Sequence, residues 1–147
     1  MAYPNRVQRR RAVIKMGDGA EPENFTLICG IQTTGITAQT NTSDDFLADC
    51  ADPEKIPVRF VIPTGEQWDL TGDGVVNLDN LSQLVDAKGV TKNYRFEMEL
   101  GTGQTGTPAV FEGPFMLTNI QIGGSEDNFA SINVSFVSDG EVTFQQV

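Results

Sequence analysis

The sequence contains no histidine, and this absence limits the chemistry that the protein can perform. Histidine is the commonest general base near neutral pH and the commonest zinc ligand in proteins. Two cysteines, Cys29 and Cys50, are too few to complete a zinc site without further ligands. The glycine-rich segment 101–106 lacks the Lys-Ser/Thr ending of a phosphate-binding loop, and no nucleophile–base signature occurs. We therefore predict that the protein is not an enzyme and that it holds no catalytic residue, metal or cofactor.

Long apolar runs are also missing. No segment approaches the roughly 20 apolar residues of a membrane-spanning helix. The first residues lack the apolar stretch and the small-residue cleavage site of a secretory signal. We expect no membrane partner, and we expect both cysteines to be reduced thiols of a protein made in a cytoplasm. A disulfide between Cys29 and Cys50 is the alternative.

Negative charge is absent from the start of the chain, which is strongly basic. Half of the 10 basic residues lie within the first fifteen positions. The remainder carries five basic residues against 20 acidic ones, a net charge of −15. The five basic residues of the first fifteen positions are Arg6, Arg9, Arg10, Arg11 and Lys15. Such a division favours contact between the start of one copy and the body of another, while the body has the wrong sign to bind nucleic acid.

The pattern of apolar residues predicts one mainly β domain. Residues 1–20 are interpreted as an N-terminal arm, and 21–147 as a β-sandwich or barrel of about eight strands with one packed α-helix. The clearest strand is 94–100, in which apolar and charged residues alternate. The helix is expected at 77–88, with Asn77 as N-cap and Gly89 as C-cap. Its predicted apolar face consists of Leu78, Leu81, Leu84 and Val85.

Residues 41–57 read as a long acidic loop. Such a long loop in a compact domain is unusual and is often functional. Apolar side chains within the acidic segment favour docking on another surface over simple solvation. A proline-glycine turn at 63–65 and a strand break near Gly113 and Pro114 are further expectations.

Residues 69–80 resemble a calcium-binding loop in part. Asp69, Asp73 and Asn77 match ligand positions, but the last position, which needs a bidentate carboxylate, is Asn80. The competing interpretation is a glycine-rich connection from a strand to the helix. A calcium-dependent β-sandwich binding module that uses this loop is thus the alternative function.

Three segments together resemble the major tail proteins, or tail tube proteins, of long-tailed bacteriophages. The first is Trp68-x-Leu-Thr-Gly-x-Gly-Val-Val, which leads into the helix. The second is 136–144, Phe-Val-Ser-Asp-Gly-Glu-Val-Thr-Phe, and the third runs from Cys29 through Thr40-Asn41-Thr42 to Asp49-Cys50-Ala-Asp-Pro-Glu54. The strongly basic start matches no motif of the family.

This resemblance implies a structural virion protein that forms hexameric rings, stacked into a tube through which DNA passes. In the family, the long loop and the terminal arm reach the neighbouring ring, so deletion of residues 2–15 should impair stacking more than folding. The implied partners are further copies, the tape-measure protein, the tail terminator and distal tail proteins, with assembly in the host cytoplasm and a final place in the virion. The expected inter-subunit residues are Arg6, Arg9, Arg10, Arg11, Asp44, Asp45, Phe46, Leu47 and Asp49. Glu97, Glu99 and Glu112 are the candidates for an acidic channel lining that does not retain duplex DNA.

Overall fold

A computed structural model describes residues 12–99 and 107–146. It confirms the mainly β architecture, with eight strands and one helix among these residues. In chain order the elements are β1 (Ala12–Gly17), β2 (Phe25–Leu27), β3 (Ile31–Leu47), β4 (Val58–Val75), α1 (Leu81–Ala87), β5 (Thr91–Met98), β6 (Ala109–Ser125), β7 (Asn128–Ser138) and β8 (Thr143–Gln146).

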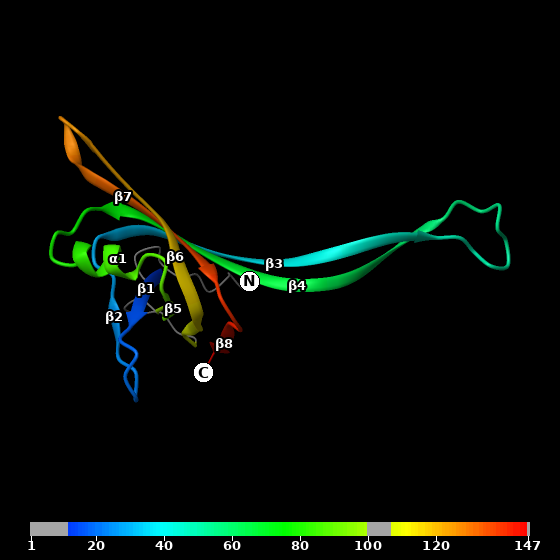
Figure 1. The fold of residues 1–147 in the computed structure, drawn as a ribbon, viewed down its shortest axis with the longest axis horizontal. Coiled ribbons are helices and arrows are strands. Elements are labelled where there is room, and N and C mark those ends of the chain that lie inside the picture. Colours follow the sequence, from blue (N-terminus) through cyan, green and yellow to red (C-terminus); the bar gives the residue numbers. More distant parts are fainter. Residues whose placement is uncertain (1–11, 100–106, 147) are drawn as a thin grey trace, which may run out of the picture.

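The strands form one antiparallel sheet in the order β2-β1-β5-β6-β7-β4-β3, and β8 pairs with the first residues of β6. The sheet is open but strongly curled (Figure 1). The curl brings β1 near the start of β3, where the Thr34 hydroxyl donates a hydrogen bond of 3.0 Å to the Ala12 carbonyl. The two ends of the sheet thus enclose a core without closing a barrel.

The core lies inside this curl, beneath α1. Alternation along β5 buries Tyr94 and Phe96, while α1 contributes Leu84 and Ala87. The two aromatic rings of Tyr94 and Phe136 pack with their centroids 4.7 Å apart. The other buried members of this cluster are Ile14, Ile28, Leu70, Phe115, Leu117, Ile132 and Val134.

A long β3–β4 hairpin projects far from this core (Figure 1). The prediction of a loop at 41–57 was therefore wrong in part, because residues up to Leu47 are paired with β4 and only 48–57 connect the strands. The turn expected at 63–65 is also absent. There β4 continues through Pro63 with a register shift opposite Asn41 and Thr42, so the proline lies at an irregularity of the ladder.

The expected arm is shorter than the sequence indicated. Residues Ala12–Gly17 form β1, which lies between β2 and β5 in the sheet. Ile14 is only 1% exposed, because this strand contributes to the core. Deletion of residues 2–15 would remove a core strand, so any test of the arm must stop at residue 11.

The helix begins later than the sequence indicated. Asn80, not Asn77, is the N-cap of α1, because the Asn77 side chain accepts a hydrogen bond from the Asp79 amide in a preceding turn. The predicted apolar face is correct for Leu81 and Leu84, whereas Leu78 and Val85 are exposed. The C-cap of α1 is Lys88, not the predicted Gly89. Gly89 follows the cap with a φ of +78°, a conformation that favours glycine.

Two glycines allow close chain crossings. A Cβ on Gly74 would collide with the Gly30 carbonyl oxygen, at the root of the hairpin. A Cβ on Gly113 would approach the Glu141 carbonyl oxygen to 2.9 Å, where the C-terminal segment crosses β6. Because Gly113 accommodates this crossing, β6 continues through Gly113 and Pro114 without the strand break that the sequence suggested.

We predict that Tyr94→Phe stabilises the monomer by about 1 kcal/mol, since the buried Tyr94 hydroxyl has no hydrogen-bond partner among the described residues. Burial raises the pKa of Tyr94 from 10.0 to about 12. The Tyr94 hydroxyl therefore loses its proton at a lower pH in the unfolded chain than in the folded protein. The free energy of unfolding of the wild-type protein should consequently fall as pH rises from 10 towards 12. Denaturant unfolding at pH 7, 10 and 11.5 measures both effects. A lower stability of Tyr94→Phe at pH 7, or no growth of its advantage at high pH, would contradict the prediction.

Candidate assembly surfaces

The described residues contain no group of three or more side chains arranged to hold a metal ion. Asp69 and Asp73, the proposed calcium ligands, lie within β4 and not in a loop. Because strand residues project alternately to either side, these two carboxylates stand along one face of the sheet and do not converge. The interpretation of 69–80 as a calcium-binding loop was therefore wrong.

None of the helices within 12–99 and 107–146 is long and apolar enough to cross a membrane.

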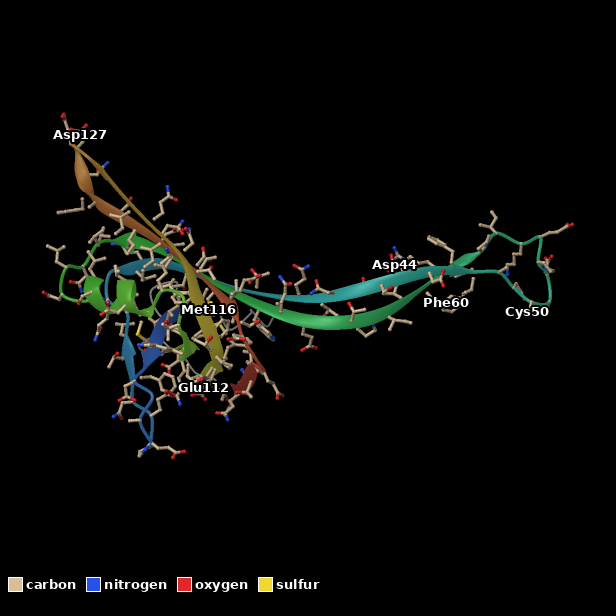
Figure 2. All side chains as sticks on the ribbon, in the orientation of Figure 1. Asp44, Cys50, Phe60, Glu112, Met116 and Asp127 are labelled. Atoms are coloured by element: carbon tan, nitrogen blue, oxygen red, sulfur yellow. The ribbon has the colours of Figure 1, made fainter. Side chains whose placement is uncertain are left out.

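The hairpin end, defined as residues 43–62, carries large apolar side chains that the monomer does not cover. Phe46 is 65% exposed and Ile62 is 66% exposed, although side chains of this kind are usually buried. The other exposed members are Leu47, Ile56, Val58, Phe60 and Val61. Figure 2 shows Asp44 and Phe60 on this distal part of the hairpin and Cys50 in its terminal loop. Several large apolar side chains exposed close together in this way mark an interaction site.

Acidic groups surround this apolar surface. The hairpin end contains five acidic and two basic residues, a net charge of −3. Asp44 lies 3.8 Å from the Arg59 guanidinium. Asp45 accepts a hydrogen bond from the Phe46 amide within β3, and Asp49 accepts one from the Ala51 amide in the connecting loop. The structure thus brings together the predicted contact residues Asp44, Asp45, Phe46, Leu47 and Asp49. The predicted Arg6, Arg9, Arg10 and Arg11 lie outside the described residues.

The two cysteines are exposed free thiols, so the structure does not contain the alternative Cys29–Cys50 disulfide. Cys50 lies in the loop of the hairpin end, whereas Cys29 precedes β3 at the root of the hairpin.

The carboxylates proposed to line a channel lie on the outer face of β1, β5 and β6, where basic side chains pair with them. Lys15 lies 2.6 Å from Glu97 and 3.6 Å from Glu99, and Arg95 lies 3.1 Å from Glu112. The hydrogen bond to Glu97 raises the pKa of Lys15, against the opposing effect of burial. Arg95 also lies 4.1 Å from the centroid of the Phe25 ring. This face is therefore a largely charge-balanced network.

A second outer face has a different composition. We call it the polar sheet face: the side of β3, β4, β7 and the later part of β6 that is opposite the buried Leu70, Val134 and Phe136. Its residues are acidic or uncharged, and none is Lys or Arg. They are Thr33, Thr37, Asp69, Thr71, Asp73, Asn119, Gln121, Asn133 and Ser135. The alternation of Asp69, Thr71 and Asp73 signalled a polar strand face, but the sequence analysis considered this segment only as a glycine-rich connection or, alternatively, a calcium loop.

The sheet also has two edges that suit pairing between copies. β3 is the last strand at one edge. β6, beyond Leu117, pairs in the described part of the chain with β7 alone. Because β6, β7, β4 and β3 alternate in direction, the β6 of one copy would run antiparallel to the β3 of a second copy in the same orientation. Such edges are liabilities unless they are covered.

Free sheet edges and an exposed apolar hairpin define a structural subunit that associates through its surfaces. The sequence model of the phage tail tube protein family matches residues 7–144, so the chain belongs to that family. The family resemblance noted from the sequence is therefore confirmed, and with it a structural role in a phage tail tube.

Solved structures share the fold. A chain of the virion of a native gene transfer agent particle is 19% identical with a TM-score of 0.70, covering 94% of this chain and 98% of that one. A chain from the tail of the empty gene transfer agent particle, refined with C6 symmetry, is 21% identical with the same TM-score and coverages. The SPP1 tail tube gives 12% identity and a TM-score of 0.63, covering 97% of this chain and 80% of that one. A comparison with curated proteins found no match.

Proposed function

We propose that six copies of this protein form a closed ring, that the rings stack, and that the stack is a channel for DNA delivery into a host cell. The observation that carries this proposal is the hairpin end, whose apolar side chains need a partner that the monomer does not supply. The sixfold symmetry reported for the gene transfer agent tail supports the ring size.

Within a ring, we place the β3 edge of one subunit against the β6 edge of the next. These strands bound the same four-stranded part of the sheet, and their directions allow antiparallel pairing. A head-to-tail contact that closes on itself leaves no exposed edge for uncontrolled growth. Ring closure therefore explains how a long edge strand can be tolerated.

Between rings, the hairpin end is the connector. β3 has 17 residues, which span roughly 55 Å at about 3.3 Å per residue, so the hairpin reaches well beyond its own body. The basic arm, now restricted to residues 1–11, is proposed to meet the acidic hairpin end of another subunit through Arg6, Arg9, Arg10 and Arg11. Opposite charges favour this contact, most strongly at low salt.

The polar sheet face is proposed as the channel lining in place of the face with Glu97, Glu99 and Glu112. The network of Lys15 and Arg95 already compensates much of the negative charge on the face with Glu97, Glu99 and Glu112. The polar sheet face instead presents Asp69 and Asp73 with no neighbouring base among its own residues. Repulsion by these carboxylates, screened beyond a Debye length of about 8 Å at physiological salt, keeps a DNA backbone from adhering.

The wider role follows from this arrangement. The tube would enclose a tape-measure protein during assembly, end on tail terminator and distal tail proteins, assemble in the host cytoplasm and become part of the virion. The protein performs no catalysis in this role.

The double substitution Asp69→Lys and Asp73→Lys should make the channel retain DNA, because it replaces two negative charges per subunit by two positive ones. Short duplex DNA incubated with preformed open-ended tubes should then become resistant to nuclease, whereas wild-type tubes give no protection. Asp79→Lys with Asp86→Lys makes the same change in charge on the α1 side and should leave any bound DNA digestible. Protection by the second variant and not by the first would contradict the assignment of the lining.

Deletion of residues 2–11 should leave the monomer folded and weaken ring stacking. Wild-type protein should form tubes with sixfold end views in negative-stain microscopy, in the presence of an initiating complex if needed. The deletion variant should have an unchanged melting temperature but fewer and shorter tubes, with the difference decreasing at high salt. A variant with normal tube length would contradict the role of the arm.

A further inference from the structure

An apolar row crosses the four-stranded part of the sheet from one edge to the other. Ile31 on β3 stands opposite Gly74 on β4, and Gly74 stands opposite Ile132 on β7. Ile132 in turn stands opposite Ile122 on β6. Because paired residues share a face of the sheet, this row lies on the face that carries the core. The row thus ends in an isoleucine at each of the two edges.

The two isoleucines at the ends of this row are covered to different extents. The Ile31 side chain lies over Gly72, where an added Cβ would approach it to 2.9 Å, and it packs against the core. Ile122 is 50% exposed, although its cross-strand partner Ile132 is only 4% exposed. The uncovered part of the apolar face therefore lies at the β6 edge.

The turn that leads into α1 carries a second uncovered apolar side chain, Leu78, which is 81% exposed. This turn lies against the residues that precede β3. The Asn80 side chain donates a hydrogen bond of 3.1 Å to the Cys29 carbonyl. A Cβ added to Gly30 would lie 3.5 Å from the Asn77 Cβ. Leu78 is therefore placed near the start of the β3 edge, next to a helix that packs on the core face of the sheet.

Ile122 and Leu78 lie at the same end of the molecule but at different edges of the sheet. α1, the start of β3 and the tip of the β6–β7 hairpin, marked by Asp127, are all remote from the hairpin end (Figure 1; Figure 2). Within one chain, three strand spacings separate the β3 and β6 edges, roughly 14 Å at about 4.8 Å each. Two chains joined edge to edge bring the two side chains together.

We propose that Ile122 of one subunit packs against Leu78 of the next subunit in the same ring. We call this the seam contact, because it lies beside the paired β6 and β3 edges of the two subunits. The inference rests on the proposed pairing of these edges. When β6 of one copy continues the sheet at β3 of the next, the apolar row repeats around the ring, and its Ile122 end meets the β3 end beside Leu78.

The seam contact supplies a register that strand pairing alone lacks. Backbone hydrogen bonds between two edges repeat along the strands, so they permit a slip of two residues that keeps both faces unchanged. Such a slip would move Ile122 along the seam by about 7 Å and separate it from Leu78. The contact therefore selects one register between subunits, and it lies on the face opposite the proposed channel lining.

Charge substitutions at the two positions test the seam contact. Ile122→Lys and Leu78→Glu should each raise the critical concentration for tube formation about tenfold or more, since each places an unpaired charge in an apolar contact. The double variant should return to within about threefold of wild type, because the two charges then pair. Val85→Glu, at another exposed apolar position on α1, is the matched control and should stay within about twofold. Normal assembly of the single variants, no recovery in the double variant, or equal impairment by Val85→Glu would overturn the seam contact.

Disulfide trapping shows which subunits are in contact. Cys29 and Cys50 are replaced by serine, Leu78→Cys and Ile122→Cys are introduced together, and assembled tubes are oxidised with copper phenanthroline. The seam contact predicts a ladder in non-reducing denaturing gels that stops at six chains. Leu78→Cys with Val137→Cys is the control, because Val137 pairs with Asp69 on the polar sheet face, and this variant should stay monomeric.

The other outcomes of this trapping experiment separate the seam contact from the ring itself. A ladder that continues beyond six chains would place the contact between rings, and a monomer band from intact rings would remove it. Either result overturns the seam contact while leaving the ring in place. Absence of rings and tubes from wild-type protein with an initiating complex would instead refute the proposed function.

Discussion

The constraint on which the rest of the structure depends is that a hairpin carrying seven large exposed apolar side chains at its end needs another surface to cover it. An isolated two-stranded hairpin has little stability in water, and the apolar groups here add a further cost of hydration. Within the body, by contrast, the curled sheet and α1 cover the apolar faces of β1, β4, β5, β6 and β7. The body is thus a complete folding unit, whereas the hairpin end, in our proposal, is covered only on assembly.

The two outer faces of the sheet divide the electrostatic roles. On β1, β5 and β6, Lys15 and Arg95 compensate the carboxylates of Glu97 and Glu112 and so hold neighbouring strands together. On β3, β4 and β7, the polar residues leave Asp69 and Asp73 without compensation from that face. The same antiparallel sheet therefore has one face on which basic side chains balance the carboxylates, and one face, the proposed channel lining, that carries Asp69 and Asp73 without a base of its own.

Much of the body could be predicted from the sequence. The alternation at 94–100 predicted a strand with Tyr94 and Phe96 inside, and Gly89 marked the end of the helix. The hairpin was harder to predict, because most residues of Asn41–Leu47 are polar and the segment resembles a loop. Only its pairing with β4 identifies it as a strand. Ala12–Gly17 was assigned to the arm because its basic neighbours masked the alternation of Ala12, Ile14 and Met16. Asp69 and Asp73 fit a metal loop in spacing, and only the strand geometry separates them from one.

Hydrogen–deuterium exchange of residues 43–62 in the monomer and in assembled tubes tests the central claim most directly. Exchange reports local opening of backbone hydrogen bonds, which solvent-exposed hairpins undergo readily. We predict rapid exchange in the monomer and strong protection in the tube, confined largely to the hairpin end and the strand edges, while core amides of β5 stay protected in both. Equal exchange of residues 43–62 in monomer and tube would contradict the claim that assembly buries the hairpin end.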